Sequence, residues 1–154
     1  ILVDCDDPAA MSAIGDAEAA GAGTVKWGGT HCTESALCDV LDVDALTALV
    51  QLGITLRASE ATVRDDLTAY HSGTITTLDV GVWIQDGELD LQAARDLIGK
   101  TAKKREWFKS IPNGGTLGEF VWARIDSLTP TSFGEKLTLI KNQIYGVEPS
   151  KTDV

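Results

Sequence analysis

The chain has 154 residues, of which 44% are hydrophobic, and a formal net charge of −10 at pH 7. This hydrophobic content is enough to bury a core, so the composition excludes disorder throughout, and the length is typical of one domain. No apolar run approaches the roughly 18 residues of a membrane-spanning helix, no signal peptide is visible, and the negative charge disfavours nucleic acid as a partner, so we expect a cytoplasmic or virion protein.

The charge is unevenly divided along the chain. Residues 1–77 hold twelve acids and three bases, whereas residues 78–154 hold eleven acids and ten bases. The acidic half of one copy can therefore attract the other half of a neighbouring copy. The three cysteines are an odd number, which favours reduced thiols over a disulfide framework. The chain begins at Ile1 rather than Met, which indicates a processed product or a fragment.

The first half of the chain predicts short strands between helices. Asp7-Pro8 is a helix start signal, with an acidic cap followed by proline at the first helical position. Asp42 or Asp44 is a candidate break within a long helical pattern. The expected elements are strands at residues 1–3 and 24–27 and helices at residues 9–20, 34–52 and 59–70.

The second half predicts one strand and three helices. Residues 74–84 are rich in Thr, Ile, Val and Trp and form the most convincing strand pattern. Asp90 is the expected cap of a helix from residue 91 to about residue 108. Residues 112–115, with the sequence Pro-Asn-Gly-Gly, predict a loop.

The stretch 115–146 predicts two amphipathic helices joined at Pro130. Thr116 and Ser132 are the expected N-caps, each with a glutamate three residues later. Pro130 ends the first helix at Thr129, and Gly146 ends the second. We therefore expect a mainly helical α+β fold with one small sheet or hairpin, a single domain at 1–146 and a tail or linker at 147–154.

An acidic cluster near the start is a candidate metal site. Asp4, Asp6 and Asp7 follow an apolar triplet, and carboxylates at a strand end commonly hold Mg²⁺ or Ca²⁺. The stretch ILVDCDDPAAM resembles the opening of nucleoside hydrolases, which implies calcium binding. The chain lacks the longer spacer of that motif and is much shorter than that fold. Helix capping by a solvated acidic end is the alternative explanation.

His31, Cys32 and Cys38, with Cys5 and His71 elsewhere, are the candidate zinc ligands or nucleophiles. Zinc sites usually use close ligand pairs, and the spacing H-C-x5-C supplies no second pair. A cysteine thiolate with a histidine base is chemically conceivable, but sequence adjacency does not assure the geometry. Burial of these residues in a core is the alternative.

The stretch LGITLRASEATVRDDL resembles a helix-turn-helix, and its second part resembles the recognition helix of DeoR-type repressors. That resemblance implies DNA binding. Asp65 and Asp66 stand where those repressors usually carry bases, and a phosphate backbone would repel them.

The segment KTAKKREWFK, residues 100–109, is the basic patch of the sequence. Lys100, Lys103, Lys104 and Arg105 are its candidate contact residues. The patch is either a solvated helix end, where cations are favoured by the helix dipole, or an electrostatic contact with an acidic partner such as another copy.

The segments GTLGEFVWARIDSL and TSFGEKLTLIKNQ, within residues 115–143, resemble helical regions of tailed-bacteriophage structural proteins. The resemblance implies a virion component such as a connector, adaptor, cement or tail protein, with no cofactor. The expected function is thus non-enzymatic assembly with copies of itself or other structural proteins. The expected interface anchors are Trp107, Phe120, Trp122, Phe133 and Ile140. A small metal-dependent hydrolase and an acidic regulatory binding module are the alternatives.

Overall fold

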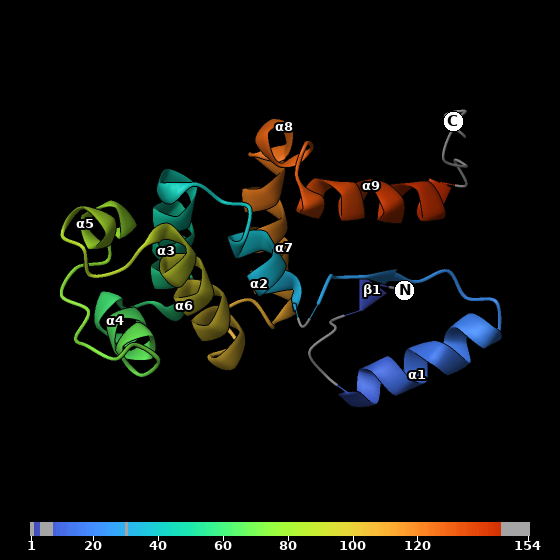
Figure 1. The fold of residues 1–154 in the computed structure, drawn as a ribbon, viewed down its shortest axis with the longest axis horizontal. Helices are drawn as coiled ribbons and strands as arrows, with labels where there is room; N and C mark the ends of the chain where they lie inside the picture. The colour runs from blue at the N-terminus through green and yellow to red at the C-terminus, as the bar shows by residue number, and fades with distance from the viewer. Residues whose placement is uncertain (1, 4–7, 30, 146–154) are drawn as a thin grey trace.

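The computed structural model describes residues 2–3, 8–29 and 31–145 and is mainly helical, with a minimal β component (Figure 1). This confirms the expected α+β class. The elements are β1 (Leu2–Val3), α1 (Pro8–Ala19), β2 (Val25–Lys26), α2 (Thr33–Cys38), α3 (Val43–Arg57), α4 (Glu60–Thr68), α5 (Val80–Gln85), α6 (Leu91–Lys104), α7 (Ile111–Trp122), α8 (Ile125–Leu128) and α9 (Ser132–Tyr145). None of these helices is both long and apolar enough to cross a membrane.

Helix starts follow local capping chemistry. The Asp42 and Asp90 carboxylates each accept a hydrogen bond at 2.8 Å from the backbone N–H three residues later, at the starts of α3 and α6. The predicted break in the 34–52 pattern therefore falls at Asp42. Ser59 caps α4 in the same way, with Thr62 as the donor. These side chains satisfy N–H groups that the first turn of a helix leaves without partners.

The main core lies among α2 to α7. Trp83, Trp107, Leu37, Leu46 and Ile98 are among its fully buried side chains. Helix α6 packs directly on α2, because Gly99 has no side chain and a Cβ there would lie 3.0 Å from the Cα of Ser35. Helices α2 and α6 therefore lie side by side at the centre of this core (Figure 1).

The N-terminal part forms a small parallel β-α-β unit beside α9. Leu2 pairs with Val25 and Val3 pairs with Lys26, and α1 makes the connection between the two strands. The predicted strands at 1–3 and 24–27 are thus confirmed over two residues each. Strand β2 contacts α9, so this unit lies on the side of the molecule away from α3 to α5 (Figure 1).

The predicted strand at 74–84 is wrong. Residues 74–79 have irregular backbone, and helix α5 begins at Val80 because the Asp79 side chain accepts hydrogen bonds from the N–H groups of Gly81 and Val82. Val80 and Trp83 then bury themselves on one face of this short helix. A cap and the burial of an indole outweigh the β-propensity of this stretch.

The predicted loop at 112–115 is also wrong, because α7 begins at Ile111. Ser110 is its N-cap, accepting from the N–H of Asn113 at 3.2 Å, and Pro112 lies in the first turn, where proline is tolerated. The Thr116 hydroxyl donates to the carbonyl of Pro112 instead of capping a helix. The predicted helix end before Pro130 is confirmed, since α8 ends at Leu128. The proposed tail, residues 147–154, lies outside the described residues.

Candidate protein-binding groove

Three of the predicted interface anchors belong to the core, so their assignment to an interface is wrong. Trp107 is completely buried, and its indole covers Gly53, where a Cβ would lie 2.9 Å from the ring. The Trp107 Nε1–H donates to Asp66 Oδ2 at 3.1 Å. Phe120 and Phe133 are 8% and 4% exposed. Phe133 stacks on Trp27 with ring centroids 4.9 Å apart. These rings hold the fold together and are not free to contact a partner.

Trp122 differs from the other tryptophans because its side chain is 74% exposed, at the C-terminal end of α7. Helix α7 buries Leu117 and Phe120 on its inner face, and Trp122 lies on the opposite side. Ile140 on α9 is half-buried. Of the predicted aromatic anchors, Trp122 is therefore the one that remains available at the surface.

Trp122 forms one wall of an apolar groove between α7, α8 and α9. The groove has a volume of about 730 Å³, and Lys141 is the one charged side chain that lines it. Its lining residues are Gly118, Val121, Trp122, Ile125, Thr129, Gly134, Leu137, Thr138, Lys141 and Tyr145. Tyr145, like Trp122, is 74% exposed. Contiguous exposed apolar surface of this kind marks interaction sites in soluble proteins.

The groove takes its shape from a tight junction between α8 and α9. A Cβ on Gly134 would lie 2.6 Å from Thr129 Cα and 2.7 Å from Thr129 O, so the backbones approach more closely than any other residue allows. The Thr131 hydroxyl accepts from the Gly134 N–H at 3.3 Å and caps α9, in place of the predicted cap Ser132. After this junction α9 runs away from α7 (Figure 1), and the groove lies between the two helices.

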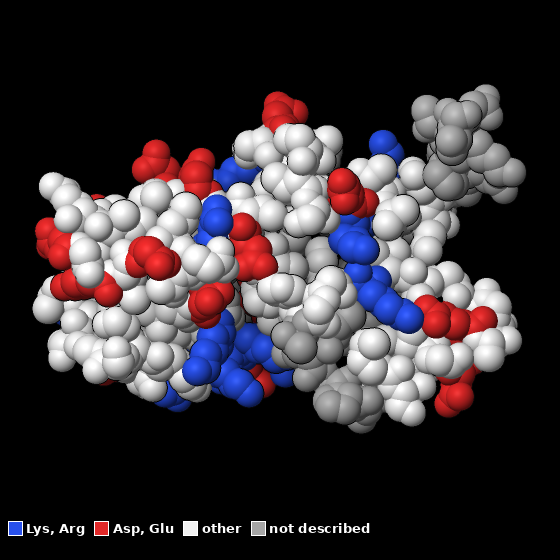
Figure 2. All heavy atoms as spheres, in the orientation of Figure 1, with Lys and Arg blue, Asp and Glu red and all other residues white. Residues whose placement is uncertain are grey.

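The predicted basic patch is a separate surface, and several of its cations have partners within the chain. Arg105 Nε lies 3.3 Å from Asp66 Oδ1, and both Arg105 and Lys100 lie over the ring of Tyr70. Lys103 is half-buried and Lys104 is exposed. On the face in Figure 2, basic side chains gather below α6 and again beside α9, and acidic side chains are frequent over α3 to α5. The basic patch and the α7–α9 groove are therefore two different surfaces, with no lining residue in common.

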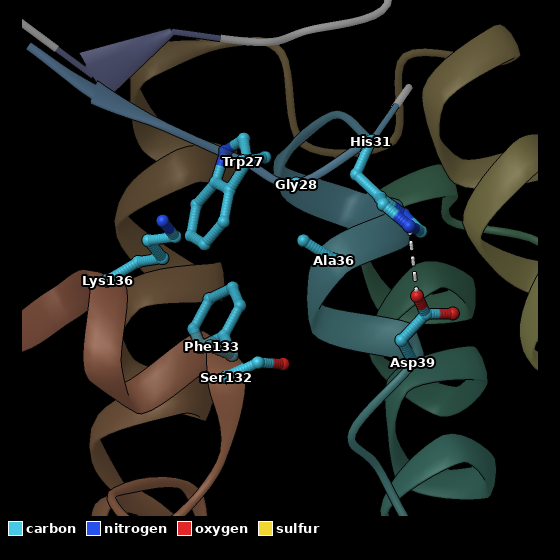
Figure 3. Close-up of a pocket in the computed structure, with 8 residues that line it drawn as sticks. All are labelled: Trp27, Gly28, His31, Ala36, Asp39, Ser132, Phe133 and Lys136. Atoms are coloured by element: carbon cyan, nitrogen blue, oxygen red, sulfur yellow. Dashed lines mark ion pairs between the residues drawn. The ribbon is translucent and has the colours of Figure 1, made fainter.

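A smaller pocket of about 220 Å³ lies between β2, α2 and α9 (Figure 3). His31 Nε2 lies 3.3 Å from Asp39 Oδ2 on one side, and the stacked Trp27 and Phe133 close the other. Lys136 also lines it, with its amine near Trp27 in Figure 3. Because the two rings are buried against each other, neither offers a free face for stacking a ligand.

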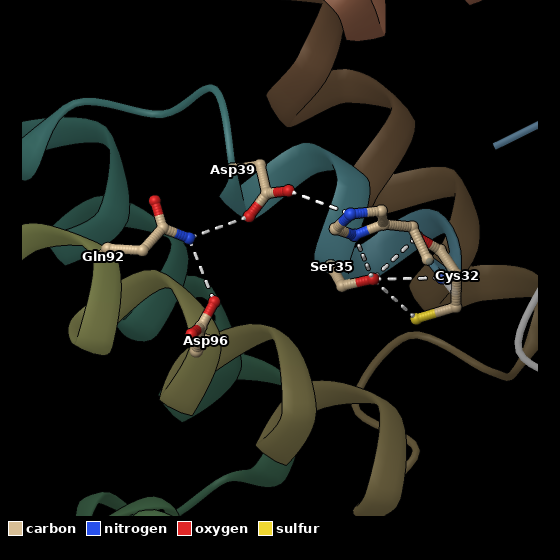
Figure 4. A network of polar contacts seen from close by, with 6 residues as sticks. Cys32, Ser35, Asp39, Gln92 and Asp96 are labelled. Atoms are coloured by element: carbon tan, nitrogen blue, oxygen red, sulfur yellow. Dashed lines mark hydrogen bonds and ion pairs between the residues drawn. The ribbon is translucent and has the colours of Figure 1, made fainter. Parts of the chain in front are cut away.

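The candidate nucleophiles form a chain of polar contacts with a local structural role (Figure 4). His31 Nδ1 lies 3.2 Å from Ser35 Oγ, which is 3.5 Å from Cys32 Sγ. Ser35 Oγ also accepts from the Cys32 N–H at 3.0 Å and donates to the Cys32 carbonyl at 3.2 Å, as the capping box of α2. Ser35 does not line the pocket beside His31. The geometry is that of a helix cap.

The two described cysteines are buried thiols. Burial raises the pKa of Cys32 above its ordinary value, and the full burial of Cys38 raises the pKa of that thiol much further. A raised pKa disfavours the thiolate, which is the nucleophile and the metal ligand. Within the described residues, no three His, Cys, Asp or Glu side chains are grouped to hold a metal. Asp4, Cys5, Asp6 and Asp7 lie outside the described residues.

We expect both described cysteines to resist alkylation in the folded protein. At pH 8, Cys32 and Cys38 should react with iodoacetamide at least about 100-fold more slowly than in urea, because the native state holds them protonated and covered. Peptide mass spectrometry after timed quenching measures each cysteine separately. Rapid native labelling of Cys32 would show an accessible thiolate and would favour the nucleophile hypothesis.

Helices α3 and α4 are joined by a tight turn, as the helix-turn-helix resemblance predicts, but the buried acid on α4 stabilises the fold. Ala58 turns the chain between the helices with a left-handed φ of 55°. Asp66 on α4 is buried and lies 3.6 Å from Arg57 Nε, in addition to its contacts with Arg105 and Trp107. Asp65 is exposed on the same helix. The carboxylate that the sequence placed on a DNA-reading face instead joins α3, α4 and the end of α6.

Comparisons with protein-family models, curated proteins and solved structures give no match for this chain. The structure itself shows a mainly helical α+β protein with an apolar surface groove. The sequence reasoning identified Trp122 but missed Gly118, Gly134 and Tyr145 as groove residues. The spacing of Gly115, Gly118 and Trp122 along one helical face was the signal that could have found the groove.

Proposed function

We propose that the chain is a non-enzymatic assembly protein that binds apolar protein surface in the α7–α9 groove. The observation that carries this proposal is Trp122, which is 74% exposed and forms a wall of a 730 Å³ groove. A solvent-exposed tryptophan is costly to leave in water, and tryptophan is enriched among the residues that dominate binding energy at interfaces.

The same helices carry the resemblance to tailed-bacteriophage structural proteins. The resembling segments span residues 115–143, which include most of α7, all of α8 and most of α9. We therefore propose a virion component such as a connector, adaptor, cement or tail protein. This finer assignment predicts that peptides of the chain are found by mass spectrometry in gradient-purified virus particles. Their absence from such particles would contradict it.

The groove itself is tested with an apolar dye. At a protein concentration too low for self-association, anilinonaphthalene sulfonate should bind the wild-type chain with enhanced, blue-shifted emission, and Gly118→Leu should lower that signal several-fold. Gly118 lines the groove and a Cβ there meets nothing within 4 Å, so the backbone accepts a side chain, and a leucine should fill part of the groove. Circular dichroism should show that the variant remains folded.

Gly15→Leu is the matched control for this experiment. Gly15 is also an exposed helical glycine whose Cβ would meet nothing within 4 Å, but it lies on α1, away from the groove. Dye binding by this variant should equal that of the wild type. Equal dye signals from wild type and Gly118→Leu would show that the groove does not bind apolar surface and would refute the proposed function.

A further inference from the structure

We propose that the groove's partner is the same face of a second copy of this chain, in a two-fold dimer in which each Trp122 enters the groove of the other copy. This inference rests on the proposed function and names the partner.

The exposed side of α7 carries glycines that allow another backbone to approach it closely. Gly115, Gly118 and Trp122 recur at spacings of three and four on this side, and all three are exposed. Glycine within a helix costs about 1 kcal/mol relative to alanine. A Cβ at Gly115 or Gly118 would meet no atom of the chain within 4 Å, so packing inside the chain does not explain either glycine. Together with the groove beside them, these two glycines leave room for a second backbone to pack against α7.

The face is complementary to itself, which a two-fold contact requires. A two-fold interface uses the same patch on both subunits, so the patch must carry both the projecting group and the hollow that receives it. Trp122 projects from the end of α7, and the hollow beside it is bounded by Gly118, Gly134 and Thr138, which are small residues. A rotation about an axis through the groove therefore places each indole over the small residues of the other copy.

The exposed aromatic side chains beside the groove supply a substantial part of the area that a dimer interface buries. Buried large aromatic side chains cover about 150–250 Å² each, so Trp122 and Tyr145 would supply roughly 300 Å² of the about 800 Å² that each partner buries in a standard interface. The remaining groove residues, such as Val121, Ile125 and Leu137, add to this area. The chain's own segment 146–154, GVEPSKTDV, has two apolar residues and is a poorer occupant than the apolar face of a copy.

The charges also fit a second copy. Lys141 lines the groove on α9, and Asp126 is exposed on α8 next to Ile125, which also lines it. The proposed two-fold rotation brings α9 of one copy over α7 and α8 of the other, which allows each Lys141 to pair with an Asp126 of its partner. Such pairs fix the register more than they add affinity.

The affinity of the proposed dimer should increase with salt concentration. Each chain carries −10, so two copies repel one another at long range, and the groove contributes little charge to offset this. Screening by salt removes that repulsion, and hydrophobic contact is not weakened by screening. The groove-to-groove dimer should therefore tighten several-fold between low salt and about 0.5 M NaCl. A dimer held by acids against the basic patch of α6 would loosen over the same range.

The experiment is sedimentation equilibrium of the full chain from ~1 to ~500 µM, a range that covers micromolar dissociation constants, at both salt concentrations. The wild type should convert from the mass of one chain to that of two as its concentration rises. Gly118→Leu and Trp122→Ala should each raise the dissociation constant of the dimer at least about tenfold. The leucine variant decides the mechanism, because it adds apolar surface. Non-specific hydrophobic association would increase with Gly118→Leu, whereas a close-packed contact at α7 is blocked. Gly15→Leu should dimerise like the wild type.

Acrylamide quenching of tryptophan fluorescence measures whether Trp122 becomes covered when the chain dimerises. Of the four tryptophans, Trp27, Trp83 and Trp107 are at most 3% exposed, so quenching of the monomer reports Trp122. The quenchable fraction should fall with concentration in the wild type and stay constant in Gly118→Leu. A wild-type chain that remains monomeric throughout would overturn the second-copy inference, as would a dimer in which Trp122 stays quenchable. Groove-dependent dye binding by such a chain would leave the proposed function standing, which separates the two failures.

Discussion

Replacing Trp107 by alanine should lower the free energy of unfolding by about 3–5 kcal/mol, the usual cost of truncating a fully buried tryptophan. The substitution removes an indole that has no exposed surface and packs directly over Gly53 of α3. It also removes the N–H that hydrogen-bonds Asp66, leaving that buried carboxylate with only its two arginine neighbours, Arg57 and Arg105. Urea denaturation followed by circular dichroism at 222 nm measures the change.

Trp122→Ala is the control for Trp107→Ala, because the same substitution is made at a tryptophan on the surface. Its side chain is 74% exposed, so the change in unfolding free energy should stay within about 0.5 kcal/mol at a concentration where the chain is monomeric. The two tryptophans were equivalent interface anchors in the sequence-based prediction. Equal destabilisation by both substitutions would contradict the burial that the structure assigns to them.

Gly134→Ala should lower the free energy of unfolding by several kcal/mol although it adds only one methyl group. The new Cβ would lie 2.6 Å from Thr129 Cα and 2.7 Å from Thr129 O, and these are backbone atoms that cannot rotate away. Relief of the overlap requires α9 to shift from α8, which alters the groove. Thermal and urea denaturation measure the loss, and dye binding by the folded fraction should fall.

Gly118→Ala, the same substitution on the other side of the groove, should change the free energy of unfolding in the opposite direction. A Cβ at Gly118 meets no atom within 4 Å, so the methyl group costs no packing and gains helix propensity. We expect an increase of roughly 0.5–1 kcal/mol in the unfolding free energy of the monomer. Gly134→Ala with wild-type stability would show that the α8–α9 junction is looser than described.

Local chemistry explains which elements were predictable from the sequence. Asp42, Ser59 and Asp90 act within three residues of themselves, so the sequence located the starts of α4 and α6 correctly and placed a break at Asp42 or Asp44, where α3 begins. The start of α7 was missed because Ser110 is followed by Pro-Asn-Gly-Gly, a turn-like sequence that forms the first turns of a helix. Its hydrophobic contacts with the rest of the fold, which the sequence does not display, decide in favour of helix.

The site was harder to predict because burial is a property of pairs of elements. Trp107 and Trp122 both lie in apolar, helix-forming stretches, and periodicity shows only that each helix has an apolar side. Which side is covered depends on α3 packing over Trp107 and on Gly134 turning α9 away from α7. Gly53 and Trp107 are 54 positions apart, so no local pattern contains their contact. Gly134 and Thr129 are only five positions apart, but hydrophobic periodicity does not show how closely their backbones approach. Residue type alone therefore gave the candidates, and the fold selected among them.

The packing of α6 on α2 has a consequence for synthesis on the ribosome. Ser35 meets Gly99, which follows it by 64 positions in the chain. At about 5–20 residues per second, roughly 3–13 s pass between the appearance of α2 and that of the helix that covers it. During this interval the apolar sides of α2 and α3 have no final partner, so they are a natural binding surface for chaperones. A lower temperature weakens hydrophobic association during this interval, so production of the chain in the cold should give more soluble protein.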